Sequence, residues 1–246
     1  MKNQWIELIP AEPELAKEVA EYYRRNREFL KAFEPEREEN FFSEEYQREL
    51  LKKEADDRKQ GTSYRLYIRL VEAPREIIGV IGLNNIVRGA FQSSFLGGKL
   101  DNKYINRGYM SMAVDMIVKY GFEELKLHRI EGNVMPRNKA SLRVMEKNGF
   151  VCEGLSRHYL KINGVWEDHV HMVRLNEGEQ ENRLGAFEKM LESVRSQYDT
   201  TVKKMDQLKA EGKEKTVTYR QLFANKLQYQ NMLSCYQAYG LLKDEK

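Results

Sequence analysis

Residues 104–113, with the sequence YINRGYMSMA, combine residue types that can bind phosphate. Gly108 lets the backbone turn so that its amides point outward, together with the positive end of the helix expected to follow. Arg107 adds a cation, and Ser111 adds a hydroxyl donor. The segment is therefore a candidate pyrophosphate cradle, although one glycine before a helix is more often an ordinary turn.

Histidine and lysine residues elsewhere in the chain could bind a metal ion or RNA, but their spacing argues against both. His169 and His171 present two imidazoles on one face of a predicted strand, but no third ligand accompanies them, so we expect no metal site. His158 falls on a hairpin edge, where we expect a structural role. Five lysines near the C-terminus are interleaved with glutamate, which favours a solvated helix surface over contact with RNA. They are Lys203, Lys204, Lys209, Lys213 and Lys215.

The elements that must position the loop follow from apolar periodicity and turn residues. We expect strands at residues 5–9, 63–72, 76–87, 92–100, 128–135, 150–162 and 165–175. We expect helices at residues 12–33, 43–60, 110–125 and 138–148. This order predicts an α/β (α+β) fold, with a mixed sheet flanked by helices.

Cap and turn residues set several of these boundaries. Ser43 is a good N-cap for the second helix, and Gly61 ends that helix. Gly149 is expected to close the helix at 138–148 in a left-handed conformation. Asn163 and Gly164 suit a type I′ turn between the last two strands.

Composition limits the class of protein. The 246 residues include 41 Lys and Arg against 38 Asp and Glu, and a net charge of +3 leaves no large basic field for nucleic acid. The chain is 41% hydrophobic, enough to bury a core. No apolar run approaches the roughly 20 residues of a bilayer span, and the N-terminus lacks an apolar signal core. Because Cys152 and Cys235 form no framework, we expect a cytoplasmic protein without membrane contact.

The region from residue 177 has no strand-like run and no proline. Apolar residues recur there in steps of three and four, the pattern of a packed helix seam. They are Leu184, Phe187, Leu191, Val194, Tyr198, Thr201, Met205 and Leu208. After Gly212, residues 218–221 (TYRQ) match a capping box. The helix that follows has an apolar stripe of Leu222, Phe223, Leu227, Leu233 and Tyr236.

These patterns predict two domains, residues 1–176 and 177–246. The second is expected to be a coiled-coil-like, antiparallel two-helix hairpin. Because two helices alone rarely bury enough surface to be stable, the hairpin should dock on the first domain, on a second copy of the chain or on a partner protein.

Nine blocks occur in the first 175 residues in a recognisable order. They are residues 26–37 (NREFLKAFEPER), 76–79 (EIIG), 85–91 (NIVRGAF), 106–110 (NRGYM), 128–131 (HRIE), 135–139 (MPRNK), 148–150 (NGF), 159–160 (YL) and 162–169 (INGVWEDH). In this order the blocks resemble the GNAT superfamily of acetyl-CoA-dependent N-acetyltransferases, most closely the Rim-type ribosomal-protein alanine N-acetyltransferases. The resemblance implies a GNAT-like, mostly antiparallel sheet flanked by helices, with the helical tail outside it.

The resemblance implies that residues 105–111 correspond to the family's acetyl-CoA signature, Gln/Arg-x-x-Gly-x-Gly/Ala. The main chain of Arg107, Gly108, Tyr109, Met110 and Ser111 would then hold the pyrophosphate. Ile105 stands at the Gln/Arg position and Met110 at the final Gly/Ala position, so Met110 must point away from the ligand.

The implied reaction is attack of a neutral primary amine on the acetyl thioester. The amine must lose a proton, and the carbonyl oxygen and the departing thiolate must be stabilised. Asn138 and Ser141 match the family's Asn-x-x-Ser, where Asn contacts the pantetheine arm and Ser lies near the acetyl sulfur. Gly97 and Gly98 are expected to permit a bulge and strand separation that admit the acyl arm, with amides toward Leu100 serving the carbonyl.

The sequence leaves the general base open. Leu160 occupies the position where some relatives have a glutamate. Glu131, on the preceding strand, is the nearest carboxylate and shares a face with Asn133, but it is also placed to pair with Arg129. A water chain is a further alternative, since an α-amino group has a pKa of only about 7.7–8.0.

Two residues are candidates for the acceptor site. Glu34, beside Pro35, is expected to pair with the incoming ammonium, and Tyr159 is expected to line the opposite wall. The resulting hypothesis is transfer of acetyl from acetyl-CoA to a protein or peptide N-terminal amine, possibly of a ribosomal protein, in a ternary complex without a metal. The alternatives are acetylation of a small amine, such as a polyamine, amino sugar or antibiotic, and a non-catalytic acetyl-CoA-binding scaffold that works through its tail.

Overall fold

The chain forms two compact units, Met1–Asn176 and the region from Glu177 onward. The computed structural model describes residues 1–242, without the side chains of residues 178–184. Within this part of the chain, no helix is both long enough and apolar enough to cross a membrane.

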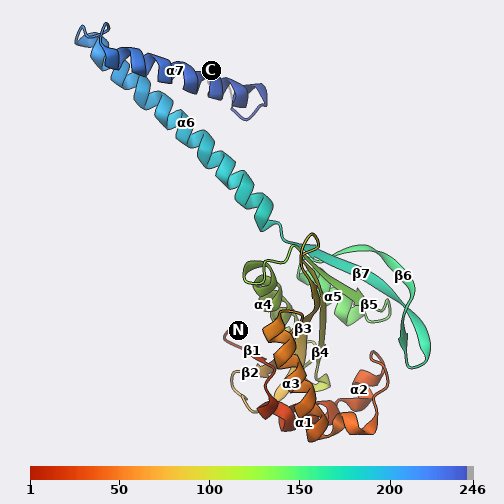
Figure 1. Ribbon diagram of the computed structural model, residues 1–246. Coiled ribbons are helices and arrows are strands. Elements are labelled where there is room, and N and C mark those ends of the chain that lie inside the picture. The colour runs from red at the N-terminus through yellow and green to blue at the C-terminus, as the bar shows by residue number, and fades with distance from the viewer. Residues whose placement is uncertain (243–246) are drawn as a thin grey trace. The chain divides into compact units, whose positions relative to one another are not determined.

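The first unit alternates helices and strands in the predicted order (Figure 1). Its strands are β1 (Ile6–Pro10), β2 (Tyr64–Leu70), β3 (Ile77–Val87), β4 (Ser93–Leu100), β5 (Arg129–Val134), β6 (Val151–Ile162) and β7 (Val165–Leu175). Its α-helices are α1 (Ala16–Arg25), α2 (Arg27–Lys31), α3 (Glu44–Gln60), α4 (Tyr109–Glu123) and α5 (Lys139–Lys147). Short 3₁₀ turns are η1 (Pro13–Leu15), η2 (Glu39–Phe42) and η3 (Asn102–Tyr104).

The strands form one sheet in the order β1-β2-β3-β4-β5-β7-β6. All neighbours are antiparallel except β4 and β5, so the predicted mixed, mostly antiparallel sheet is confirmed. The parallel pairing joins only Ser93–Phe95 to Arg129–Glu131. Beyond Phe95 and Glu131 the two strands continue without pairing, which leaves a gap in the middle of the sheet.

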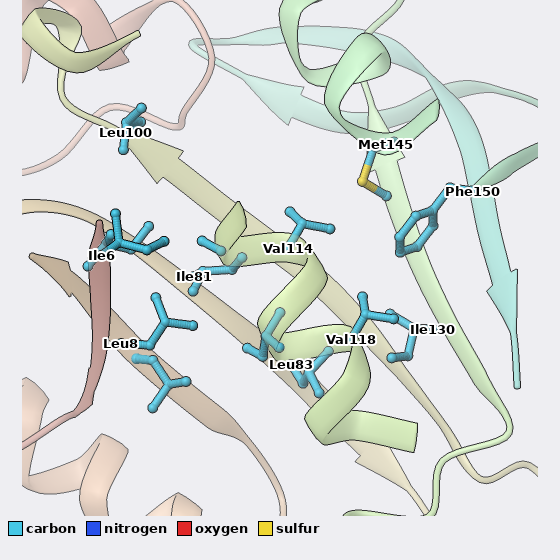
Figure 2. Close-up of a cluster of buried hydrophobic side chains, with 14 of the residues drawn as sticks. Ile6, Leu8, Ile81, Leu83, Leu100, Val114, Val118, Ile130, Met145 and Phe150 are labelled. Atoms are coloured by element: carbon cyan, nitrogen blue, oxygen red, sulfur yellow. The ribbon is translucent and has the colours of Figure 1, made fainter. Parts of the chain in front are cut away.

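Helices cover both faces of the sheet. Successive strand residues point to opposite faces, so neighbours in one strand join different buried clusters. Leu66 and Ile68 of β2 belong to a buried cluster on one face. Figure 2 shows other members of this cluster, among them Val114 of α4 and Met145 of α5. Tyr67, between Leu66 and Ile68, belongs to a second cluster formed with α1 and α3. We call these the α4/α5 face and the α1/α3 face.

Most predicted caps and turns are confirmed. Ser43 Oγ accepts a hydrogen bond of 3.2 Å from the backbone N–H of Tyr46 and so caps α3. Gly61 and Gly149 have φ values of 71° and 74°, the left-handed conformation that ends a helix. Asn163 and Gly164 both have positive φ, as a type I′ turn requires.

The helix predicted at residues 12–33 is interrupted at Asn26. Only 1% of Asn26 is exposed, and its Nδ2 donates to Tyr22 O and to Asp101 Oδ2, each at 2.9 Å. The prediction of one helix was wrong. Asn26 is held out of helical geometry by Asp101, which lies 75 residues further along the chain and is therefore absent from any local pattern.

The bulge predicted at Gly97 and Gly98 is also wrong. β3 and β4 pair in unbroken register through both glycines, as far as Asn84 opposite Phe95. Gly98 serves close packing instead, since a Cβ there would lie 3.3 Å from Met110 Sδ. The predicted strand separation is present, between β4 and β5.

The second unit consists of α6 (Gly178–Ala210) and α7 (Val217–Ala238), which run antiparallel (Figure 1). Phe187 near the start of α6 packs on Tyr236 near the end of α7, with ring centroids 5.3 Å apart. The predicted seam positions from Leu191 to Leu208 are all buried or half-buried, whereas Phe187 is 45% exposed. The side chain of Leu184 lies outside the described residues.

Two details of α7 differ from the prediction. Its N-cap is Thr216, whose Oγ1 accepts from the Tyr219 N–H at 3.2 Å, whereas Thr218 lies inside the helix. The less exposed positions of α7 are Tyr219, Leu222, Asn225, Lys226, Tyr229, Met232, Leu233 and Tyr236. Phe223 and Leu227 lie outside this stripe and are exposed. The aliphatic stem of Lys226 takes a position in the stripe, which a pattern of apolar residues alone does not predict.

Candidate active site

The first turn of α4 is open to a ligand. Gly108 is the N-cap of α4 with φ of 83°, and a Cβ there would meet only Met112 Cε, at 3.8 Å. Met110 packs against Gly98 in β4 and therefore points away from the open side, as the sequence predicts. The structure describes every residue of α4, and the first turn of this helix contains no acidic residue. Its amides and the positive end of its dipole are thus available to an anion.

Side chains around this turn support the same use. Ser111 Oγ accepts a hydrogen bond of 3.0 Å from Asn148 Nδ2, so the hydroxyl proton of Ser111 is free to be donated elsewhere. Arg107 is exposed and lies over the ring of Tyr104, with its guanidinium carbon 5.5 Å from the ring centroid. The loop therefore presents a cation and a hydroxyl beside the amides.

The edge of β4 that faces the gap carries free backbone groups. The N–H of Asp101 donates to Ile78 O of β3 at 2.8 Å. Because backbone groups of successive strand residues point to opposite edges, the N–H and C=O of Leu100, Gly98 and Leu96 point toward the gap. β5 no longer pairs with β4 there. An extended ligand with amide groups can hydrogen-bond along this edge, as a strand would.

Asn138 and Ser141 lie at the start of α5. Asn138 is the N-cap, with Oδ1 accepting from the Ser141 N–H at 3.1 Å. Its Nδ2 remains available as a donor. Ser141 is half-buried, and its hydroxyl makes no hydrogen bond to the residues that the structure describes. Both side chains can therefore still serve a ligand.

Glu34 is not a free carboxylate. Its Oε1 lies 2.6 Å from Lys99 Nζ of β4, and its Oε2 lies 3.8 Å from Arg37 Nη2. Lys99 also lies over the ring of Tyr23, 5.0 Å from its centroid, and so belongs to the α1/α3 face. An incoming ammonium would have to share the Glu34 carboxylate with these cations or displace them. The sequence did not indicate this competition.

A small pocket lies beside Glu34. Its lining includes three carboxylates and three cations, together with aromatic rings: Glu28, Glu34, Glu36, Arg27, Lys31, Arg37, Tyr23, Phe41 and Phe42. The charges balance. The pocket therefore has no excess negative charge to favour a polycation.

The β6–β7 hairpin contacts the end of α2. Asn163 Nδ2 in its turn donates to Lys31 O at 2.6 Å. Arg137 pairs with Glu167 of β7 at 2.9 Å and lies over the Phe33 ring, 5.6 Å from its centroid. Residues 31–33 and the hairpin therefore lie side by side, and a shared acceptor groove of Glu34 and Tyr159 stays a prediction.

Tyr159 and Glu131 belong to one row of hydrogen-bonded side chains, which also contains two residues without a predicted role. Asn133 Nδ2 donates to Tyr159 Oη at 3.2 Å, and His171 contacts both Asn133 and Glu131. Glu131 also pairs with Arg129 at 3.3 Å, the structural alternative that the sequence allowed. Among the described residues, no three His, Cys, Asp or Glu side chains are grouped to hold a metal ion.

A buried polar network fixes the loop that leads to α4. Asp101, 1% exposed, accepts from Arg25 Nε at 2.5 Å and from Asn26 Nδ2 at 2.9 Å. Asn26 Oδ1 accepts from the Asn102 N–H at 3.0 Å. Desolvation raises the pKa of Asp101, but hydrogen bonds from Asn26, the Lys103 backbone and Arg25 outweigh it, so the pKa lies below its ordinary value. A conspicuous Asp at a strand end was the only sequence signal of this network.

Comparisons with known proteins agree with this geometry. Residues 6–151 match the model of the Acetyltransferase (GNAT) domain family. The chain is 39% identical over 181 residues to the protein named Probable N-acetyltransferase YjcK of Bacillus subtilis (strain 168), covering 74% of this chain and 99% of that protein.

Two solved structures are similar as well. Ribosomal-protein-S5-alanine acetyltransferase from Vibrio fischeri is 32% identical with a TM-score of 0.68, over 72% of this chain and 96% of that one. RimJ of Mycobacterium smegmatis, in complex with CoA-disulfide, is 24% identical with a TM-score of 0.66, over 70% and 83% of the two chains. The open turn of α4, the gap beside β4 and these matches lead to one conclusion: the chain belongs to the GNAT acetyltransferases and is an acyltransferase.

Proposed function

We propose that this protein transfers acetyl from acetyl-CoA to the N-terminal amine of a protein or peptide, such as a ribosomal protein. The observation that carries the proposal is the unpaired edge of β4, from Leu96 to Leu100. The helix α4, with its open first turn, packs on the same sheet. An edge of amides and a helix N-terminus suit the two parts of coenzyme A, an amide-bearing arm and a pyrophosphate. RimJ of M. smegmatis binds a CoA-disulfide on the same fold.

On this proposal, the α4 side of the site holds the acyl donor. The amides of Gly108–Ser111 bind the pyrophosphate, with Arg107 as an added cation. Asn138 Nδ2 orients the pantetheine arm. The Leu100 N–H points into the gap and polarises the thioester carbonyl, where negative charge develops during attack.

The acceptor approaches from the α1/α3 face. The amine nitrogen attacks the carbonyl carbon, the C–S bond breaks as the amide forms, and the sulfur leaves as a thiolate. The proton that the nitrogen loses as the amide forms ends on this thiolate, carried through water or through the Ser141 hydroxyl, which gives one proton and takes one back, and Ser141 stabilises the thiolate by a hydrogen bond until then. An α-amine has a pKa of about 7.7–8.0, so a substantial part is already neutral at cellular pH.

The protein acceptor is supported by a relative. The V. fischeri enzyme, named as an acetyltransferase of a ribosomal-protein alanine, is 32% identical over 96% of its length. Acetylation of a small amine is the second candidate. The balanced charges of the pocket beside Glu34 argue against a polyamine among such amines.

The test is turnover of the full chain with acetyl-CoA and a panel of peptides that begin with Ala, followed by release of free thiol. The same peptides with a blocked N-terminus serve as matched controls, and polyamines, amino sugars and amino acids form a second panel. Thiol release that requires a free peptide α-amine is the expected result. Faster turnover of a small amine than of every peptide would replace the protein acceptor, and the absence of thiol release with any amine would overturn the proposal.

A further inference from the structure

Four side chains form a continuous hydrogen-bonded row across strands β5, β7 and β6. Glu131 Oε2 lies 2.9 Å from His171 Nε2, and His171 Nδ1 lies 2.8 Å from Asn133 Oδ1. Asn133 Nδ2 then donates to Tyr159 Oη at 3.2 Å. Asn133 and His171 are direct cross-strand neighbours, which fixes the centre of the row.

The row lies on the acceptor side of the gap. Ile130 and Gly132 of β5 face α4 and α5, since a Cβ on Gly121 would meet Ile130 and a Cβ on Gly132 would meet Met145. Glu131 and Asn133 therefore face the α1/α3 side. Glu131 is the last β5 residue paired with β4, so Asn133 stands in the separated part of the sheet.

A bulge in β6 directs Tyr159 toward this row. Ser156 pairs with His169 and Leu160 pairs with Glu167, so three residues of β6 oppose Asp168 alone. The backbone of His158 has φ of 49°, and its N–H donates to Asp168 Oδ1 at 2.8 Å. The Tyr159 ring packs on His169 of β7, 5.6 Å between centroids, and its hydroxyl reaches across to β5. Tyr159 is still 40% exposed.

The directions of the hydrogen bonds define what Tyr159 presents. A carboxylate only accepts, so His171 donates through Nε2 to Glu131. With Asn133 donating to Tyr159, the oxygen of the Asn133 amide faces His171 Nδ1, and the row is complete when both ring nitrogens of His171 carry an N–H, one for Glu131 and one for Asn133. The hydroxyl of Tyr159 then accepts from Asn133, so its own proton and its second lone pair are directed toward the exposed side.

Glu131 is poorly placed to take a proton from the amine. Its side chain is 14% exposed, and its oxygens are held by His171 at 2.9 Å and by Arg129 at 3.3 Å. Arg129 is shared with Glu153, whose Oε1 lies 3.0 Å from Nη1. Tyr159 is the exposed member of the row, whereas its three other members are half-buried.

We propose that His171 and Glu131 are positioning residues, which act through Asn133 to hold the Tyr159 hydroxyl where it orients the acceptor amine. This inference rests on the proposed function. Tyr159 is the residue that touches the amine: its free lone pair accepts an N–H of the nucleophile, which directs the nitrogen lone pair at the carbonyl. His171 sets the Asn133 amide, and Glu131 sets the ring of His171. Glu131 takes no proton from the amine and forms no covalent bond.

The test is a double-mutant cycle on the full chain, with the best peptide acceptor. Tyr159→Phe and His171→Ala should each lower kcat/KM for the peptide by about tenfold, because each loses one orienting contact. The double variant should be no more than about twofold worse than Tyr159→Phe, since His171 acts only through Tyr159. The affinity for acetyl-CoA should not change. Independent losses that multiply to about a hundredfold would overturn the proposal.

Glu131→Gln separates positioning from base catalysis. A glutamine oxygen can still accept from His171 Nε2, so we expect a loss of less than about tenfold, whereas loss of a general base costs about 10²–10⁴-fold. Glu153→Gln is the matched control: it removes a carboxylate from the same Arg129 without touching His171, and its activity should equal wild type. A loss of a hundredfold or more in Glu131→Gln alone would make Glu131 the base.

Two further measurements keep the outcomes distinct. If His171→Ala fails to fold, His171→Gln, which can still donate to Asn133, takes its place and should lose less activity than Tyr159→Phe; an equal or larger loss overturns the proposal. A wild-type chain without thiol release contradicts the proposed function itself, and this inference with it. An active wild type with a multiplicative cycle contradicts the positioning role alone.

Discussion

Asn148 Nδ2 donates a hydrogen bond of 3.0 Å to Ser111 Oγ, which ties the end of α5 to the first turn of α4. Asn148 is 7% exposed and is itself held by Arg174, whose Nη1 donates to Asn148 O at 2.6 Å. The helix that carries Ser141 and the turn proposed to bind pyrophosphate are therefore one unit. Because Ser111 accepts from Asn148, its own proton is directed away from α5.

Asn148→Ala should weaken this unit. The variant loses the bonds to Ser111 and to Val144 O, so we expect about 1–2 kcal/mol less stability against urea and an affinity for acetyl-CoA lowered several-fold. Urea unfolding and calorimetric titration measure the two effects. Asn40→Ala, at an exposed position in η2, is the control and should leave both unchanged. Wild-type affinity in Asn148→Ala would mean that Ser111 does not contact the ligand.

Gly108→Glu and Gly108→Gln should separate charge from backbone strain. Both variants place a side chain at φ of 83°, which costs about 1–2 kcal/mol, and neither meets a steric barrier, because only Met112 Cε lies within 4 Å of the added Cβ. Only the glutamate sets a negative charge against the pyrophosphate. The affinity of Gly108→Glu for acetyl-CoA should thus fall at least about tenfold below that of Gly108→Gln. Equal affinities in a calorimetric titration would show that the pyrophosphate lies elsewhere.

Asp101→Asn should destabilise the protein in a pH-dependent manner. The pKa of Asp101 in the folded chain lies below its ordinary value of 3.8. Its ionised form therefore adds stability that is complete above that value and is lost as pH falls through the folded pKa. At pH 7 we expect the variant to be less stable by about 2–3 kcal/mol, because a charge-assisted hydrogen bond with the partly exposed Arg25 is lost.

The difference between wild type and Asp101→Asn should shrink between about pH 5 and pH 2. Urea unfolding at a series of pH values checks this. Asp115→Asn, at an exposed position of α4, is the matched control and should change stability by less than about 0.5 kcal/mol at any pH. A constant difference over the whole range would mean that Asp101 contributes through shape rather than through charge.

Removal of residues 177–246 should leave acetyl transfer intact. Residues 1–176 form a compact unit that contains every residue of the proposed site. We expect kcat/KM for the peptide to stay within about threefold of the full chain, because all the residues proposed to contact the transition state are kept. Light scattering of both forms should reveal whether the hairpin changes the oligomeric state. A folded truncation without acetyl transfer would show that α6 or α7 belongs to the site.

The sequence by itself determined most of the elements and the resemblance to the family. The periodicity of its apolar residues, the cap at Ser43, the turn at Asn163 and Gly164 and the phosphate-binding residue types around Gly108 are local signals, and local signals act over a few residues of chain. The direction of Met110 followed from the resemblance to the family, which implies that this side chain points away from the ligand.

Only the tertiary structure decided which side chains meet. Asn26 breaks a helix because Asp101 reaches it from the end of β4, and Glu34 is occupied because Lys99 faces it. Tyr159 joins Asn133 and His171 because a bulge in β6 redirects it across β7. These contacts join residues far apart in the chain through strand register and sheet order, which no window of sequence contains. The residue types of the site could therefore be predicted, while the partners that set their roles could not.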